Sequence, residues 1–132
     1  MQTVILYLST FAVFLVIDMV GISLIIRPIF ERHVGALLAD PLRLGPAAAF
    51  YAAYVAGMLY FVSLPGAARG EGGAIFWNGL LLGLMCYGTY EFTNLATLRD
   101  WSLQQVVVDT LWGGLLTGFS AWAGVAILRW LA

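Results

Sequence analysis

The chain has 132 residues, of which 62% are hydrophobic and only 10% are charged, and its formal net charge is −1. This composition excludes an ordinary soluble globular domain, and the nearly balanced charge excludes the basic surface of a nucleic-acid-binding protein. We therefore expect an integral membrane protein that has membrane lipids as its surroundings and no nucleic-acid partner.

Four apolar segments are candidate membrane-spanning helices, at residues 4–26, 46–64, 74–98 and 103–131. At about 1.5 Å per residue, the first is ~34 Å long, which is enough to cross the hydrocarbon core of a bilayer. The expected fold class is all-α: one transmembrane domain, residues 1–132, formed by an integral membrane four-helix bundle.

Prolines suggest where the first two spanning helices end. Arg27-Pro28 is expected to end the first helix, because proline lacks the backbone N–H group that a helix interior needs. The following stretch, up to Asp40, predicts a short interfacial helix between helices one and two, with apolar residues on one side and charged residues on the other. The turn-rich sequence PGAARGEGG, residues 65–73, predicts a loop between the second and third spans.

The arginines near the helix ends predict the orientation of the bundle. Four of them share one face of the predicted bundle and two share the other: Arg27, Arg32, Arg43 and Arg99, against Arg69 and Arg129. Because cytoplasmic loops carry an excess of Lys and Arg, both termini are expected to lie on the opposite, external side.

Three carboxylates interrupt the apolar segments at a similar depth. Counted from the residues that mark the nearer ends of their helices, Asp18, Glu91 and Asp109 all lie ~12–14 Å from the same membrane face. Tyr54 of the second segment falls in the same layer. Ionisable groups at this depth are costly, and they indicate a functional site by default.

Polar and small residues follow helical spacing on the third and fourth segments. The third segment carries a stripe of Tyr87, Glu91, Asn94 and Leu98, with Tyr90, Thr93 and Thr97 beside it. The fourth carries Asp109, Gly113, Thr117, Ser120 and Gly124, with Trp112 next to them. We expect the two stripes to face each other.

Three ionised carboxylates in one layer of low dielectric constant would repel one another. At least one is therefore expected to be protonated, to pair with Arg27 or Arg99, or to coordinate a cation. A transition-metal site is not expected, because the chain has one histidine and one cysteine, and Cys86 is interpreted as a small packing residue. An all-oxygen cation site stays open, and no cofactor is indicated.

Some of these features need no ligand. Buried hydroxyl, amide and tyrosine side chains in membrane bundles often only form hydrogen bonds between helices. The glycine pairs Gly79/Gly83 and Gly114/Gly118 are typical of close helix packing, within one bundle or across a dimer interface. The tryptophans near helix ends are interpreted as interfacial anchors: Trp77, Trp101 and Trp130.

The run YGTYEFTNLATLRDW, preceded by FYAAY and followed by VDTLWGG, resembles domain-of-unknown-function family 2177, a bacterial family of small predicted four-helix membrane proteins. The usual form of the family is Y-A-T-Y-D-L-T-N-x-A-T-L, so Glu91 stands where Asp is typical, and Val20-Gly21 replaces a Trp-containing turn. The resemblance covers essentially the whole chain. It implies the bacterial inner membrane and no particular activity. Combined with the count of arginines, this location makes both termini periplasmic. The residues it points to are Asp18, Tyr51, Tyr90, Glu91, Thr93, Asn94, Thr97, Asp109, Trp112 and Gly113.

Three functions are compatible with this pattern. The first is a binding or transport protein for a proton, a cation or a small amphiphile, either as a homo-oligomer or within a larger membrane complex. The second is an intramembrane lipid- or isoprenoid-modifying enzyme, with Glu91 or Asp109 as the general acid or base. The third is an accessory subunit. The candidate ligand-binding or polar-layer residues are Asp18, Tyr51, Tyr54, Tyr87, Tyr90, Glu91, Thr93, Asn94, Thr97, Asp109 and Trp112.

Overall fold

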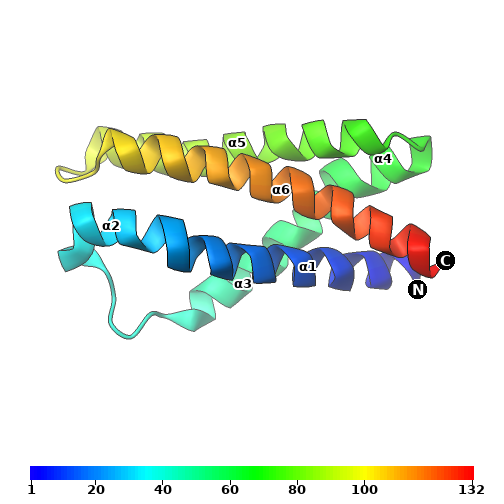
Figure 1. Ribbon diagram of the computed structural model, residues 1–132, viewed down its shortest axis with the longest axis horizontal. Helices are drawn as coiled ribbons and strands as arrows, with labels where there is room; N and C mark the ends of the chain where they lie inside the picture. The colour runs from blue at the N-terminus through cyan, green and yellow to red at the C-terminus, as the bar shows by residue number, and fades with distance from the viewer.

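The computed structural model describes residues 1–132, which form helices and the turns between them. The elements are α1 (Gln2–Gly21), η1 (Ile22–Ile26), α2 (Arg27–Val34), η2 (Gly35–Leu37), α3 (Leu44–Met58), η3 (Leu59–Ser63), α4 (Leu64–Arg69), α5 (Gly72–Thr97) and α6 (Leu103–Leu131). Both termini lie at one end of the bundle, and α2 lies beside the α5–α6 turn at the other end (Figure 1).

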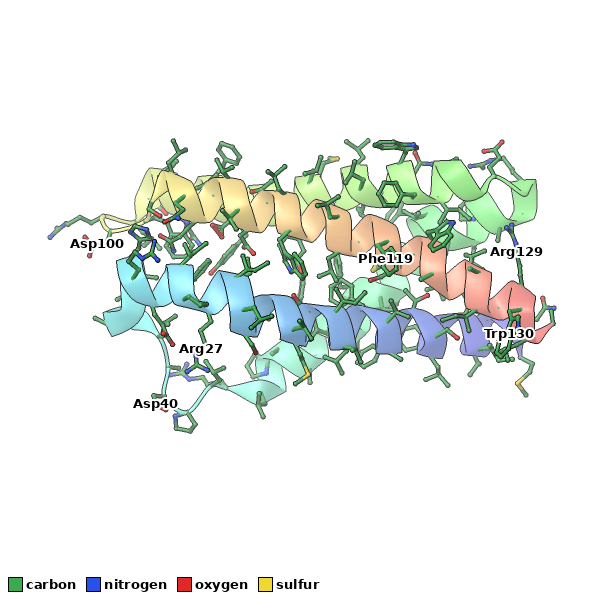
Figure 2. All side chains as sticks on the ribbon, in the orientation of Figure 1. Arg27, Asp40, Asp100, Phe119, Arg129 and Trp130 are labelled. Carbon is green, nitrogen blue, oxygen red and sulfur yellow. The ribbon has the colours of Figure 1, made fainter.

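Three continuous helical segments are long and apolar enough to cross a membrane: Gln2–Leu37, Leu44–Arg69 and Leu103–Leu131. Helix α5 is not one of these three apolar segments, so the prediction that it also spans the membrane stays a prediction. Large apolar side chains such as Phe61 and Leu115 are exposed on the outside, while charged groups gather at the ends (Figure 2). An apolar exterior with charged groups near the two ends is the distribution expected in a bilayer. The protein is therefore an all-α integral membrane bundle, as the sequence predicts.

The sequence predicts that the first helix ends at Arg27-Pro28. In the structure the helix continues through this proline. The predicted short helix is present as α2, which forms one continuous segment with α1. In the π-helical turn η1, the Arg27 N–H group bonds to the carbonyl of Ile22, five residues earlier. This wider turn changes the hydrogen-bond register just before the proline, so the missing N–H group does not break the helix.

The second helix passes its proline in the same way. The Leu64 N–H group bonds to the carbonyl of Leu59, again five residues earlier, and Pro65 then lies in the first turn of α4. The loop predicted for residues 65–73 is therefore wrong at both ends: α4 continues to Arg69 and α5 begins at Gly72, so only residues 70–71 lie between the helices. Chain reversal occurs at Gly70, whose φ of 71° is a left-handed conformation that favours glycine.

The glycine pairs join α5 to α6. A Cβ atom on Gly79 would lie 2.8 Å from the Cα of Gly118, and one on Gly83 would lie 2.8 Å from the Cα of Gly114. The two backbones therefore meet directly, as small-residue motifs allow. Because this contact is within one chain, the glycine pairs are not available as the dimer interface that the sequence left open.

Helix α3 lies obliquely to the other helices, and Figure 1 shows it diverging from α5 toward the end that holds α2. It packs against α1, whereas the following turn η3 reaches α5 and α6. The apolar core gathers around these contacts and includes Phe14, Val55, Met58 and Leu116. The divergence of α3 from α5 leaves space between these two helices on one side of the bundle.

Candidate functional site

Asp18 of α1 is buried and accepts hydrogen bonds from two other helices. The Tyr51 hydroxyl of α3 donates to Oδ2 at 2.6 Å, and the Trp112 Nε1 group of α6 donates to Oδ1 at 3.1 Å. Hydrogen bonds to a charged acceptor are strong, and they offset part of the cost of removing a carboxylate from water. Asp18 thus joins α1, α3 and α6 within the predicted polar layer.

Two glycines make room for aromatic side chains of this layer. A Cβ atom on Gly21 would overlap the Trp112 ring, and a Cβ atom on Gly113 would overlap the Tyr87 ring. Gly21 lies three residues after Asp18 and on the same side of α1, so the Trp112 ring can approach closely enough to reach the carboxylate. The contact between Tyr87 and Gly113 also shows that the predicted polar stripes of α5 and α6 face each other there.

Glu91 of α5 is fully buried and has one hydrogen-bond donor, the Trp101 Nε1 group, at 3.1 Å from Oε1. Its Oε2 atom has no hydrogen-bond partner. The side chain of Asp109 on α6 lies within hydrogen-bonding reach of the Glu91 side chain. Two acidic groups are therefore neighbours in the interior.

No arginine neutralises these carboxylates. The ion pairs of the structure are Arg27–Glu31, at 2.7 Å, and Arg69–Glu71, at 3.2 Å, and both are exposed. The interpretation in which Arg27 or Arg99 pairs with a buried acid is therefore wrong. The reason is geometric: Glu31 lies one helical turn beyond Arg27 in the continuous α1–α2 segment and takes its side chain.

A cleft of about 440 Å³ lies between α3 and α5 and reaches Asp109. Its lining residues are Phe50, Tyr51 and Tyr54 from α3, Cys86, Tyr87 and Tyr90 from α5, and Asp109 from α6. Phe50 is 62% exposed and Tyr90 is 51% exposed, whereas Asp109 is 7% exposed. The two exposed rings therefore form the mouth, and the carboxylate lies at the floor. Because the mouth lies between two neighbouring helices, it opens to the side of the bundle.

The aromatic rings of the cleft are held in fixed positions. The Tyr54 hydroxyl hydrogen-bonds to the Thr117 hydroxyl at 2.8 Å. The Tyr54 ring stacks on Phe50, with 5.7 Å between centroids, and meets the Tyr87 ring edge-on, at 6.3 Å. Since Tyr51 and Tyr54 use their hydroxyls on Asp18 and Thr117, they present mainly ring surface to the cleft.

Asp109 receives no hydrogen bond from a tyrosine or tryptophan, and its polar neighbour is the Glu91 carboxyl group. The three hydrogen bonds that tyrosine and tryptophan donate to buried carboxylates go to Asp18 and Glu91. Asp109 is also the one carboxylate that lines the cleft. Asp109 is therefore the group in this layer that is most available to a ligand.

The structure does not bring every predicted residue to this cleft. Thr93 and Thr97 are exposed on α5, and the Thr97 hydroxyl donates to the Thr93 carbonyl of its own helix at 2.8 Å. Asn94 is half-buried and does not line the cleft. Their membership in a functional site stays a prediction.

Other residues of the site were missed from the sequence. Trp101, interpreted as an interfacial anchor, is the donor to Glu91. Cys86, interpreted as a packing residue, is exposed and lines the cleft. A signal for Cys86 was present, because it lies four residues before Tyr90 and so shares its helix face. The same signal was present for Phe50, which lies four residues before Tyr54 and stacks on its ring.

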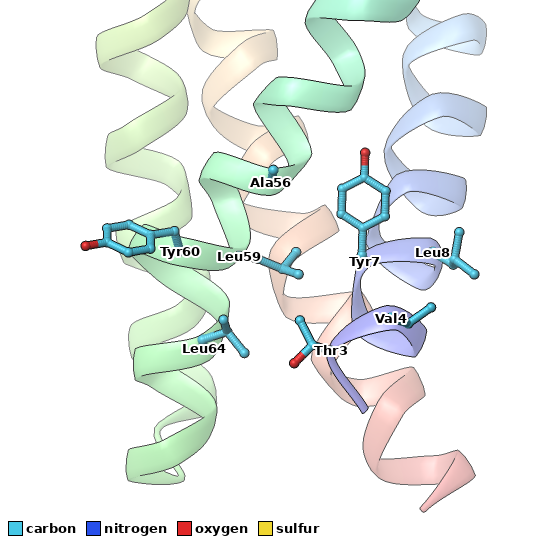
Figure 3. Close-up of a pocket in the computed structure, with 8 residues that line it drawn as sticks. All are labelled: Thr3, Val4, Tyr7, Leu8, Ala56, Leu59, Tyr60 and Leu64. Carbon is cyan, nitrogen blue, oxygen red and sulfur yellow. The ribbon is translucent and has the colours of Figure 1, made fainter. Parts of the chain in front are cut away.

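A second hollow, of about 400 Å³, lies between the start of α1 and the segment from α3 to α4 (Figure 3). Its lining residues are Thr3, Val4, Tyr7, Leu8, Ala56, Leu59, Tyr60 and Leu64. The Tyr7 hydroxyl is satisfied by the Ala52 carbonyl at 2.9 Å. No charged group lines this hollow, so it offers apolar contact only.

Together, the fold and the buried carboxylates define a small polytopic membrane protein with an internal polar layer. The family model described as "Predicted membrane protein (DUF2177)" matches residues 3–126, and the chain belongs to this family. Comparison with curated proteins and with solved structures gives no match. The family match confirms the resemblance seen in the sequence and assigns no activity.

Proposed function

We propose that this protein binds a small amphiphile, which enters sideways from the bilayer into the cleft between α3 and α5. The observation that carries this proposal is an aromatic cleft of about 440 Å³ with one carboxylate, Asp109, at its floor and no cationic side chain in its lining. A mostly apolar cavity with few polar groups is the usual form of a small-molecule site.

The size and the position of the cleft support an amphiphile. Cavities that hold drug-sized ligands are about 300–1,000 Å³, so this one accommodates a head group and a few methylene groups rather than a whole lipid. The mouth rings, Phe50 and Tyr90, lie on the outer surface of the bundle, where an apolar tail can stay among the lipid chains. The polar head then lies near Asp109.

Ligand binding is better supported than a reaction in which Glu91 and Asp109 act as the acid and the base. A general acid or base must come within hydrogen-bond reach of the reacting group. Glu91 is fully buried and does not line the cleft, so a ligand there would meet Asp109 and not Glu91. The enzyme hypothesis therefore loses one of its two candidate residues.

We further propose that the protein lies in a bacterial inner membrane, with four spans and both termini periplasmic. Arg27 and Arg129 lie at opposite ends of the bundle, in line with the predicted division of the arginines (Figure 2). Reporter fusions at the C-terminus test the orientation: alkaline phosphatase is expected to be active there, and active green fluorescent protein instead would reverse it. A homo-oligomer or a larger membrane complex stays a prediction.

Native mass spectrometry with lipidomics of the gently solubilised protein tests the binding proposal. The natural chain is compared with Cys86→Trp, which fills the cleft, and with Met85→Trp, which adds the same bulk at an exposed position of α5 outside the cleft. A co-purified amphiphile should be present in the natural chain and in Met85→Trp, and absent from Cys86→Trp. Equal occupancy in both tryptophan variants, or no bound molecule in any sample, would contradict the proposal.

A further inference from the structure

We infer that the cleft between α3 and α5 recognises a cationic ammonium head group, held between the aromatic rings and Asp109. This inference rests on the proposed function and adds the chemical class of the ligand. Two independent features of the cleft carry it: the charge at its floor and the ring surface on its walls.

The floor of the cleft carries a carboxylate that no cationic side chain neutralises. The tyrosine and tryptophan donors go to Asp18 and Glu91, and the polar neighbour of Asp109 is the Glu91 carboxyl group. The two ion pairs of the structure lie elsewhere, and no arginine or histidine lines the cleft. Burying a charge without a partner is costly, so a cation at the floor would be stabilised by Asp109.

The walls present ring surface rather than hydrogen-bonding groups. Four tyrosines and Phe50 line the cleft, and the hydroxyls of Tyr51 and Tyr54 are already occupied by Asp18 and Thr117. A cation over an aromatic ring is attracted by the negative ring face, and alkylated ammonium groups are recognised in this way. Such a head group needs few hydrogen bonds, which matches the few that this cleft offers.

Other head groups fit the same walls poorly. An anionic head group would face Asp109 without a cationic side chain to bind it. A metal ion would lack ligands, because Asp109 is the one carboxylate in the lining and no group of three or more acidic, histidine or cysteine side chains is assembled. A sugar head group would need several donors and acceptors, of which the lining offers few: the hydroxyls of Tyr51 and Tyr54 are occupied, which leaves those of Tyr87 and Tyr90 beside Asp109.

Protection of Cys86 from alkylation tests the inference. Cys86 is the single cysteine and lines the cleft, so its reaction with N-ethylmaleimide reports whether the cleft is occupied. The probes are dodecyltrimethylammonium and its neutral isostere, in which a carbon atom replaces the nitrogen. The protein is kept in dodecyl maltoside micelles, which carry neither charge nor an ammonium group.

The cation should protect Cys86 at concentrations about tenfold lower than the neutral isostere, which corresponds to ~1.4 kcal/mol. Asp109→Asn should remove this preference while the neutral isostere still protects. Phe50→Leu should reduce the preference to roughly threefold, because one ring is lost. Phe61→Leu, at an exposed phenylalanine outside the cleft, should leave it unchanged.

The outcomes separate the two proposals. Equal protection by cation and isostere would overturn the ammonium inference and leave amphiphile binding intact. No protection by either probe, with Cys86 freely reactive, would overturn both. If Asp109→Asn does not fold, the comparison of Phe50→Leu with Phe61→Leu decides: an equal preference for the cation in both variants would contradict the inference.

Discussion

Two hollows of nearly equal size border the segment from α3 to α4, and they differ in chemistry. The apolar hollow near the N-terminus has a volume of about 400 Å³, and the cleft between α3 and α5 has about 440 Å³. The first has no charged residue in its lining, whereas the second has the Asp109 carboxylate. A polar group placed in an apolar lining, rather than the volume, therefore distinguishes a candidate ligand site from a gap between helices.

The different linings follow from different parts of the sequence. Around the cleft, Tyr51 and Tyr54 on α3 and Tyr87 and Tyr90 on α5 are each spaced by three residues, so each pair shares one helix face. Around the hollow, η3 and α4 contribute two leucines and one tyrosine, Leu59, Tyr60 and Leu64, and no carboxylate.

The largest effect is expected at the contact between α5 and α6 that supports one wall of the cleft. Gly83→Ala should lower the free energy of unfolding by about 2–3 kcal/mol, because the added Cβ atom would collide with the backbone of α6. The matched change Gly57→Ala, where no atom lies within 4 Å of the new Cβ, should be neutral or slightly stabilising. Unfolding in detergent measures both, and equal stabilities would show that the glycine contact is unimportant.

Much of this architecture could be predicted from the sequence. Helix α6 has the expected bounds, Leu103–Leu131, because its capping box at Ser102 and its uninterrupted apolar run are local signals. The burial of Asp18, Glu91 and Asp109 was also expected, since carboxylates in apolar segments avoid lipid.

The rest depends on contacts that are distant in the sequence. The prolines indicated helix ends, but the turns η1 and η3 absorb Pro28 and Pro65 by a change of hydrogen-bond register that has no simple sequence pattern. The donor of Glu91 and the divergence of α3 from α5 arise from tertiary packing. The cleft itself was therefore not predicted, although its four tyrosines were predicted as site residues.

A smaller loss of stability is expected when one donor to a buried carboxylate is removed. Trp112→Phe should cost about 1–3 kcal/mol, because Asp18 loses a hydrogen bond to a charged acceptor. Trp77→Phe, at an exposed tryptophan, should change the stability by less than about 0.5 kcal/mol. The melting temperatures of the two variants are compared in the same detergent. Similar values would show that the Trp112–Asp18 hydrogen bond does not stabilise the protein.

The two hollows should also differ in ligand protection. In a Cys86→Ser background, Ala56→Cys places a thiol in the apolar hollow, to be compared with the natural thiol in the cleft. Dodecyltrimethylammonium should slow alkylation of the cleft thiol by about tenfold more than that of the hollow thiol, because only the cleft offers a carboxylate. Equal slowing at both positions would remove the distinction between the two hollows.

The smallest effect is expected in the apolar hollow. Tyr7→Phe removes the hydrogen bond to the Ala52 carbonyl and should cost about 0.5–1.5 kcal/mol of stability. Binding of an amphiphile in the cleft should be unchanged, since Tyr7 does not line it. A weaker affinity in the protection assay would mean that the two hollows act as one site.

Photo-crosslinking is the most direct test of the central claim, that a ligand occupies the cleft between α3 and α5. A dodecyltrimethylammonium probe with a diazirine near its head group is irradiated with the natural protein, and the modified peptides are identified by mass spectrometry. Crosslinks should concentrate on residues 50–54 and 86–90, which line the cleft from its two sides. Crosslinks spread evenly over the apolar exterior, or concentrated in the hollow near Thr3 and Leu64, would contradict the account.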